Sequence, residues 1–279
     1  MTSSTVNDIS VVVCVKNEED RIADCLEAIL RNKPKEVFVV DGSSTDKTVE
    51  IASRYDRINI IKSSNSNLTR DRQLGIDSTS SHLVAMIDAD HRLRDNDLQN
   101  LLDDMNYLDF DIVQSGLLSY KKESFWNNAE EECWEITQNK PGRRNMIGTA
   151  PALYRKSVFK YAKFDDTLTS TIDDTDFSYR LSKFENIAMG VGDTKIYQYH
   201  FANFKTYFKK FIWYGKGDGE FVHKNPERVG RMIFHLLIRY PILHVSKAIF
   251  RLKLRAAIFF LFQGLTRFLG FVGYFLKMV

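Results

Sequence analysis

Short apolar runs alternate with amphipathic segments over the first half of the chain. Four runs rich in β-branched residues have the length and composition of buried strands: Ile9–Val15, Glu36–Val40, Ile58–Ile61 and the residues from Leu83. The stretches between them place apolar residues at helical spacing and predict three helices: Ile22–Leu30, a short helix with Val49, Ile51 and Ala52, and Leu68–Ile76. This alternation predicts βαβ units, and therefore an α/β fold with a mostly parallel sheet flanked by helices.

After residue 90 the pattern is less regular. We expect helices and strands at the following places: helices around Leu98–Met105, Trp126–Trp134 and 174–183, and strands beginning at Ile112 and Lys195. Phe204–Tyr214 again has helical periodicity, and the glycine-rich run Tyr214–Gly219 favours a flexible hinge after it.

Two long apolar segments end the chain. Arg231–Phe250 gathers its polar residues in one sector of a helical wheel, and a kink is expected before Pro241. Ala256–Leu276 is more apolar, but Arg267 stands in mid-run, where a charge costs about 2.5–3.5 kcal/mol on insertion into a membrane. Helices lying in the plane of a membrane interface fit this pattern best. A spanning or re-entrant hairpin and a soluble dimer contact are the alternatives.

Polar residues follow directly after three of the four predicted strands. Asn17 and Glu18 follow the first strand, Asp41 ends the second, and Asp88 and Asp90 follow the fourth. The carboxyl ends of strands in a doubly wound sheet meet at one edge, where ligands bind. We therefore expect these five side chains to lie close together.

Asp88 and Asp90 are the candidates for a metal site. If the chain stays extended through Ala89, both carboxylates point to the same side and repel each other unless a cation lies between them. This suggests a divalent cation that holds a phosphate-bearing substrate. A turn with two solvated aspartates is the alternative, and Asp41 can likewise serve a turn. Ser44 or Thr45 can cap the helix after that turn.

Nucleotide motifs of other classes are missing. No Gly-x-Gly-x-x-Gly follows the first strand and the chain has no Gly-Lys-Ser/Thr P-loop, which disfavours a dehydrogenase and a P-loop ATPase. The first strand ends in the acidic, glycine-free sequence Lys16–Asp20, which argues against a nucleotidyltransferase.

The charge is unevenly distributed. From Asn203 onward there are 14 Lys and Arg against 3 Asp and Glu, a net charge of +11, whereas the preceding residues carry 25 against 33, a net charge of −8. A basic, apolar tail on an acidic body favours contact with a membrane surface, and no motif points to nucleic acid. The polar start of the chain lacks a signal pattern, and three cysteines without metal-ligand spacing fit a reducing cytosol. We expect a cytoplasmic protein, peripheral on the cytoplasmic face of a membrane.

Four stretches together resemble the motifs of family 2 glycosyltransferases in order and spacing: Ser10–Glu18, Val39–Thr48, Arg72–Gly75 and Met86–Asp90. Gln73 departs from the family's Arg-Asn-x-Gly pattern. The resemblance implies a GT-A-like, Rossmann-type domain over residues 1–202, followed by an amphipathic helical appendage over 203–279.

The resemblance also implies roles for the residues at the strand ends. Asn17, Glu18 and Asp41 would hold the nucleoside, with Asp41 at the base, and Arg72 would lie against the nucleotide. Asp88, together with Asp90, would form the Asp-x-Asp motif that binds Mn²⁺ or Mg²⁺ through the diphosphate, as hard cations bind carboxylate and phosphate oxygens.

A later stretch, Thr171–Leu181, resembles the family's Glu-Asp-x-Asp-Leu-x-x-Arg motif, with Asp173 in place of Glu. The resemblance makes Asp174 the general base that takes the proton of the attacking hydroxyl, and it implies inversion at the anomeric carbon. For Asp173 and Asp176, helix capping and a favourable helix dipole are the alternative. Relatives often place a metal-binding histidine where His200 stands.

The expected function is metal-dependent, inverting transfer of one sugar, since the Gln-x-x-Arg-Trp motif of processive synthases is missing. The donor would be a nucleoside-diphosphate sugar, with UDP-sugar favoured. The acceptor would be a glycan or lipid-linked hydroxyl, and the segment 203–279 would contact the membrane. A nucleotidyltransferase, or a non-catalytic membrane-tethered nucleotide-binding protein of the same fold, is the alternative.

Overall fold

The computed structural model describes residues 4–64, 67–168, 172–199 and 203–277. The chain divides into two compact units. One is an α/β unit of residues 1–118, 141–167 and 177–198, and the other is a helical unit of residues 119–140, 168–176 and 199–279. The helical unit thus includes residues 119–140 as well as the C-terminal helices, while the boundary at 202/203 stays a prediction.

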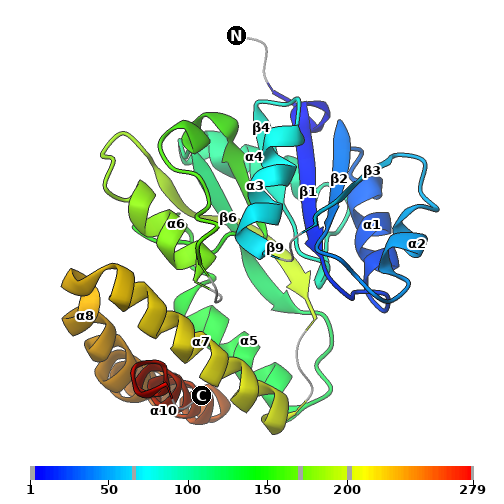
Figure 1. The fold of residues 1–279 in the computed structure, drawn as a ribbon. Helices are drawn as coiled ribbons and strands as arrows, with labels where there is room; N and C mark the ends of the chain where they lie inside the picture. The colour runs from blue at the N-terminus through cyan, green and yellow to red at the C-terminus, as the bar shows by residue number, and fades with distance from the viewer. Residues whose placement is uncertain (1–3, 65–66, 169–171, 200–202, 278–279) are drawn as a thin grey trace. The chain divides into compact units, whose positions relative to one another are not determined.

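Nine strands form the sheet in the described part of the chain, and its parallel half has the order β3-β2-β1-β4. These strands are β1 (Ile9–Val15), β2 (Glu36–Asp41), β3 (Ile58–Lys62) and β4 (Leu83–Met86). The sheet continues from β4 in the order β8 (Ala152–Arg155), β6 (Ile112–Ser119), β9 (Met189–Gln198) and β5 (His91–Arg92), and β7 (Gly142–Arg143) pairs with β9. Strand β8 is antiparallel to β4 and β6, and β9 is antiparallel to β5 and β7. The predicted α/β fold class is confirmed (Figure 1).

Helices cover both faces of the sheet, as the alternation of side chains along β1 requires. Val11 and Val13 belong to the core that includes Leu26 of α1 (Ile22–Arg31) and Leu101 of α4 (Asp97–Tyr107). The opposite face packs against α3 (Leu68–Ser78) and α6 (Asp173–Leu181). The short α2 (Thr48–Ala52) follows β2, and 3₁₀ turns lie at Val6–Asp8 and Lys156–Lys160.

Gly75 explains why α3 lies so close to the sheet. A Cβ at this position would stand 2.4 Å from Cγ1 of Val12 and 3.0 Å from Cγ2 of Val40, so only glycine permits the contact. The glycine of the Arg-x-x-Gly stretch therefore has a packing role, which sets the position of Arg72 three residues before it.

The helical unit contains α5 (Phe125–Thr137), α7 (Phe204–Lys224), α8 (Val229–Phe234), α9 (Val245–Phe250) and α10 (Leu254–Leu276). The hinge predicted at Tyr214–Gly219 is wrong, because α7 continues through this run without a break. Gly215 instead allows close packing, since a Cβ there would lie 2.0 Å from the carbonyl oxygen of Arg267 on α10. Tertiary contact outweighs the low helix propensity of glycine here.

A π-helix, labelled η4 (His235–His244), joins α8 to α9 and contains Pro241. Proline lacks the N–H that the α-helical hydrogen-bond pattern needs, and the helix departs from α geometry around Pro241. Within the described residues, two helices could cross a membrane by length and composition alone: Pro226–Phe250, which begins with the 3₁₀ turn η3 (Pro226–Arg228), and Leu254–Leu276.

Candidate active site

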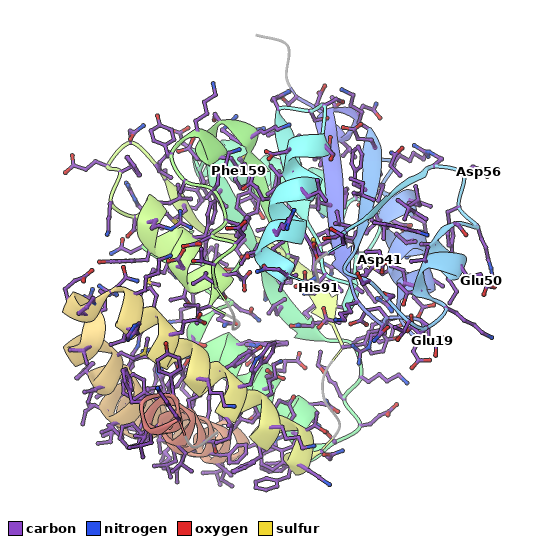
Figure 2. All side chains as sticks on the ribbon, in the orientation of Figure 1. Glu19, Asp41, Glu50, Asp56, His91 and Phe159 are labelled. Carbon is purple, nitrogen blue, oxygen red and sulfur yellow. The ribbon has the colours of Figure 1, made fainter. Side chains whose placement is uncertain are left out.

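The strand ends do converge at one edge of the sheet, as predicted. Val15, the last residue of β1, pairs in register with Asp41, the last residue of β2, and Val12 pairs with Met86 of β4. Figure 2 shows Asp41 and His91 on this same edge. The side chains that follow these strands therefore belong to one local site in the α/β unit.

A turn, not an extended strand, carries Asp88 and Asp90. Strand β4 ends at Met86, and the backbone N–H of His91 donates to the carbonyl oxygen of Asp88 at 3.0 Å. The chain is therefore not extended through Ala89, and the alternative of a turn applies to its backbone. The turn nevertheless gathers ligand atoms of Asp88, Asp90 and His91 within 4.8 Å of one another.

His91 supports the turn through its Nδ1 atom. Its Nδ1 accepts the backbone N–H of Asp88 at 2.9 Å, and its Nε2 lies 3.7 Å from Oδ1 of Asp90. An imidazole that accepts at Nδ1 is neutral and carries its proton on Nε2. Neither nitrogen then offers a lone pair to a cation, so the residues that fit a metal are the two aspartates.

Arg72 and Gln198 position the two carboxylates. Nη2 of Arg72 lies 3.4 Å from Oδ1 of Asp88, and the Arg72 side chain is 7 % exposed. Nε2 of Gln198 donates to Oδ2 of Asp90 at 2.9 Å. Carboxylate oxygens are the donors that Mg²⁺ and Mn²⁺ prefer, and a buried arginine beside them suits a diphosphate.

The loops after β1 and β2 are joined by hydrogen bonds. Oδ1 of Asn17 accepts the backbone N–H of Thr45 at 2.8 Å, and Asn17 adopts a left-handed φ of 56°. The carboxylate of Asp41 accepts the backbone N–H of Ser44 at 3.1 Å, so it does serve a turn. Neither Ser44 nor Thr45 caps α2, because that helix begins at Thr48 with Lys47 at the cap position.

Glu18 lies within electrostatic range of the aspartate turn. Burial raises the pKa of its carboxyl group, Arg21 lowers it, and the nearby Asp90 and Asp88 raise it further. The Glu18 backbone N–H donates to Oγ1 of Thr48 at 2.7 Å, which fixes this loop against the start of α2.

Arg92 was not predicted from the sequence, although it follows the Asp-x-Asp turn directly. Its Nη1 donates to the carbonyl oxygens of Ala89 and His91, each at 2.8 Å, and its Nη2 donates to that of Arg21 at 2.9 Å. One guanidinium thus ties the aspartate turn to the loop after β1. The only sequence signal for this role was the position of His91 and Arg92 next to Asp90.

The predicted base, Asp174, stands in the first turn of α6 in the helical unit. Its Oδ1 accepts the backbone N–H of Thr175 at 2.6 Å, and the side chain is partly exposed. Asp173 and Asp176 are buried instead, and Asp176 forms an ion pair with Lys224 at 2.6 Å. A structural role thus holds for Asp176, while the role of Asp174 is a prediction. His200 lies outside the described residues.

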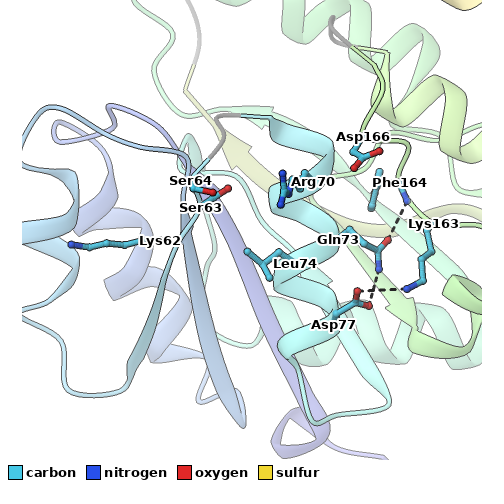
Figure 3. A pocket seen from close by; sticks show the side chains of 10 residues that line it. All are labelled: Lys62, Ser63, Ser64, Arg70, Gln73, Leu74, Asp77, Lys163, Phe164 and Asp166. Atoms are coloured by element: carbon cyan, nitrogen blue, oxygen red, sulfur yellow. Dashed lines mark hydrogen bonds and ion pairs between the residues drawn. The ribbon is translucent and has the colours of Figure 1, made fainter.

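The outer face of α3 borders a separate cavity of about 420 Å³, whose lining is drawn in Figure 3. Gln73 lies there: its Oε1 accepts the backbone N–H of Phe164 at 3.1 Å, and its Nε2 donates to Asp77 at 2.8 Å. Since Arg72 points to Asp88 and Gln73 points to Phe164, the departure from the Arg-Asn-x-Gly pattern leaves the aspartate turn untouched.

Known proteins resemble this chain in part. An uncharacterized glycosyltransferase of Rickettsia prowazekii is 28% identical over 197 residues, which are 68% of this chain and 62% of that protein. Glycosyltransferase GlyA of Streptococcus pneumoniae is 24% identical over 56% of this chain. The match spans 26% of GlyA, so the chain covers well under two thirds of the curated relatives it matches first.

Solved structures share the fold. The crystal structure of residues 1–349 of S. aureus TarS has a TM-score of 0.57 at 17% identity and covers 96% of this chain and 91% of that chain. The structure of GalNAc-T7 has a TM-score of 0.55 at 11% identity, over 70% of this chain and 44% of that chain. The family described as Glycosyl transferase family 2 matches residues 10–187, a span that contains the whole edge from Asn17 to Asp90. The chain therefore belongs to the family 2 glycosyltransferases.

Proposed function

We propose that the chain transfers one sugar from a nucleoside-diphosphate sugar, with UDP-sugar favoured, to a hydroxyl acceptor. The observation that carries this proposal is the turn that brings Asp88 and Asp90 together beside the buried Arg72. The TarS structure is also known in complex with UDP-GlcNAc and with UDP, and that of GalNAc-T7 with UDP, GalNAc and Mn²⁺. These ligands support a uridine nucleotide as the donor nucleotide of this chain.

The two aspartates would hold Mn²⁺ or Mg²⁺, which neutralises the charge of a diphosphate leaving group. Arg72 would add a second positive charge on the protein side of the same diphosphate. Asn17, Glu18 and Asp41 would border the nucleoside, because they line the loops after β1 and β2 on this edge. Asn17 and Asp41 each accept a backbone N–H within these loops, which holds their side chains in place on this edge.

Asp174 would act as the general base and accept the proton of the acceptor hydroxyl as the new bond to the anomeric carbon forms. Attack from the face opposite the leaving nucleotide gives inversion. Its partial exposure distinguishes it from Asp173 and Asp176, which are buried. A partly exposed carboxylate can meet an acceptor, and a buried one cannot.

The acceptor would be a glycan or a lipid-linked saccharide at the cytoplasmic face of a membrane. The support for this location is the basic segment 203–279 and the two helices whose length and composition suit a membrane. An enzyme held at the surface would meet a membrane-bound acceptor by diffusion in two dimensions.

Nucleotide binding tests the donor site most directly. UDP and GDP would be titrated by calorimetry with and without Mn²⁺ against the unsubstituted chain, Asp90→Asn and Asp95→Asn. Asp95 is a matched control, because its side chain is 74 % exposed and, within the described residues, forms its ion pair with Arg31 on the protein surface. We expect metal-dependent UDP binding that Asp90→Asn abolishes and Asp95→Asn preserves. Absence of binding for both nucleotides would refute the proposal.

Asp174→Asn tests the base separately. The amide oxygen of asparagine can still accept the Thr175 N–H, so the helix start should survive. We expect UDP affinity within about twofold of the unsubstituted chain and a loss of sugar transfer of roughly 10²–10⁴-fold. Retained transfer would exclude Asp174 as the base without affecting the donor site.

A further inference from the structure

Helix α10 exposes a continuous row of large apolar side chains. Its members follow helical spacing and are 45–63 % exposed: Leu254, Ile258, Leu261, Leu265, Leu269 and Leu276. We call this set the α10 row. Soluble surfaces normally carry such side chains singly, so a contiguous row marks a contact surface.

The preceding helical segment is also apolar and exposed. Six of its large side chains are 37–51 % exposed: Ile233, Phe234, Ile238, Ile242, Leu243 and Ile249. Phe250 at the end of α9 and Leu252 in the turn before α10 reach 90 % and 88 % exposure. Since α10 packs against η4 and α9, this surface and the α10 row belong to one helical layer.

The other side of α10 packs along α7. Phe259, near the start of α10, contacts Tyr207 with ring centroids 5.3 Å apart. Near the other end, Tyr274 contacts His223 with centroids 6.2 Å apart. The order of these contacts shows that the two helices run in the same direction and stay together over most of their length (Figure 1).

Helix α7 cannot enter the hydrocarbon of a bilayer. Lys205, Lys209 and His223 are exposed on it, and a lysine at the centre of a membrane is costly. A helix that is packed along α7 cannot cross a bilayer without carrying α7 with it. The structure therefore excludes a spanning α10 as long as these two helices remain packed.

The charge of Arg267 is neutralised inside this packing. Its Nε and Nη2 donate to the two carboxylate oxygens of Asp218 on α7 at 2.8 and 2.5 Å, and its Nη1 lies 3.2 Å from the hydroxyl of Tyr240. The ion pair keeps the guanidinium away from the α10 row. The free-energy cost of inserting an unpaired arginine into a membrane therefore does not oppose contact between the α10 row and a bilayer.

The geometry points to an in-plane membrane anchor, which builds on the membrane contact proposed above. Residues 229–276 lie along the surface of an anionic bilayer, with the α10 row and the Phe250–Leu252 turn in the boundary between headgroups and acyl chains. Helix α7 stays on the water side. The partner is anionic because the segment from Asn203 has a net charge of +11, with Arg231, Arg239 and Arg251 exposed.

Vesicle flotation tests the anchor. The full chain would be mixed with phosphatidylcholine vesicles with and without phosphatidylglycerol, next to the double variant Leu261→Glu/Leu265→Glu and the control Tyr107→Glu. Tyr107 is an apolar residue of the α/β unit that is 87 % exposed. We expect flotation with anionic vesicles, a partition coefficient at least tenfold lower for the double variant and no change for the control. Flotation that the double variant leaves unchanged would overturn the anchor.

Labelling from one side of sealed vesicles tests the orientation. Glu227→Cys and Arg251→Cys place a thiol at either end of the helix Pro226–Phe250, and a membrane-impermeant maleimide would be added outside. The unsubstituted chain measures the background of Cys14, Cys25 and Cys133. An in-plane helix leaves both new thiols reactive. Labelling of only one end would show a spanning helix and refute the in-plane geometry.

A second copy of the chain is the competing occupant of the α10 row. In that case light scattering of the soluble protein would show a dimer, and Leu261→Glu/Leu265→Glu would dissociate it. If the unsubstituted chain also failed to float with vesicles, the anchor would be wrong. UDP binding is measured on the same samples. A chain that binds UDP but does not float loses only the anchor, and a chain that floats but binds no nucleotide loses only the donor site.

Discussion

Nδ1 of His91 accepts the backbone N–H of Asp88 at 2.9 Å, so a buried imidazole fixes the turn that carries both candidate metal ligands. The turn is closed from the other side by the bond between the His91 N–H and the Asp88 carbonyl oxygen. Histidine here has the geometry of a support for the ligands and not of a ligand itself.

Replacement of His91 should weaken the metal site without removing it. His91→Ala deletes the acceptor for the Asp88 N–H, and loss of such an outer partner typically lowers metal affinity about 10- to 100-fold. Mn²⁺ titration in the presence of UDP would measure the change, with the exposed His82→Ala as control. If His91→Ala removes binding as completely as Asp90→Asn, the imidazole is a ligand and our assignment of its proton is wrong.

Arg92 should matter for stability as well as for the site. Arg92→Met leaves the carbonyl oxygens of Ala89, His91 and Arg21 without these donors, and buried groups that lose a partner cost about 1–3 kcal/mol each. We expect the free energy of unfolding in urea to fall by at least about 2 kcal/mol. Arg92→Lys should restore only part of it, because an ammonium cannot match the planar fork. A loss below about 0.5 kcal/mol would contradict this view of Arg92.

Gln73→Asn restores the family pattern and should not improve the donor site. The shorter side chain cannot keep both of its present contacts, to Phe164 and Asp77, so we expect a loss of about 1 kcal/mol in unfolding free energy. The UDP affinity of Gln73→Asn should stay within about twofold of that of the unsubstituted chain. Arg72→Gln, on the inner face of α3, should greatly reduce it. Calorimetry measures both affinities, and a gain for Gln73→Asn would show that position 73 reaches the nucleotide.

A fourth test concerns Glu36, at the start of β2. Burial raises the pKa of its carboxyl group, but donors from Ser10 at 2.5 Å and from the backbone of Ser80 at 2.7 Å outweigh burial, and the net pKa is lowered from 4.5. A carboxyl group with a lowered folded pKa stabilises the fold fully above the unfolded pKa. That stability is lost as pH falls from about 4.5 through the folded pKa.

Unfolding free energies of the unsubstituted chain and of Glu36→Gln should therefore differ most near pH 7. The difference should shrink as the pH falls below about 4.5, when the carboxyl group is protonated in both states. A difference that stays constant with pH would mean that the carboxylate charge plays no part.

The sequence predicted the parallel half of the sheet well because its signals are local. Ile9–Val15 is a strand with the predicted bounds, and Asp41, Asp88 and Asp90 do follow strands that share an edge. The continuation of the helix through Tyr214–Gly219 was missed, because its glycines make room for α10, which follows about fifty residues later. Close packing between distant segments leaves no trace in local propensity.

The sequence pointed to the candidate ligands of the site, which stay a prediction, and missed the side chains that support them. Two aspartates at a strand end carry a recognisable charge pattern, whereas His91 and Arg92 act through backbone groups of Asp88 and Arg21. Which backbone groups a side chain meets depends on the turn and on the neighbouring loop. Neither could be derived from spacing, and the turn itself contradicted the extended chain that spacing suggested.

The contact between α7 and α10 gives the last prediction. Gly215→Ala places a methyl group 2.0 Å from the Arg267 carbonyl oxygen and 2.9 Å from Cα of Gly270, both backbone atoms that cannot move alone. Overpacking of this kind costs typically 1–3 kcal/mol, and we expect a loss in that range in urea unfolding. Gly230→Ala is a matched helical control, because no atom lies within 4 Å of the added Cβ, and alanine should be neutral or stabilising by up to about 1 kcal/mol. Equal effects of the two substitutions would mean that α10 does not pack on α7 as described, and the case against a spanning α10 would fail with it.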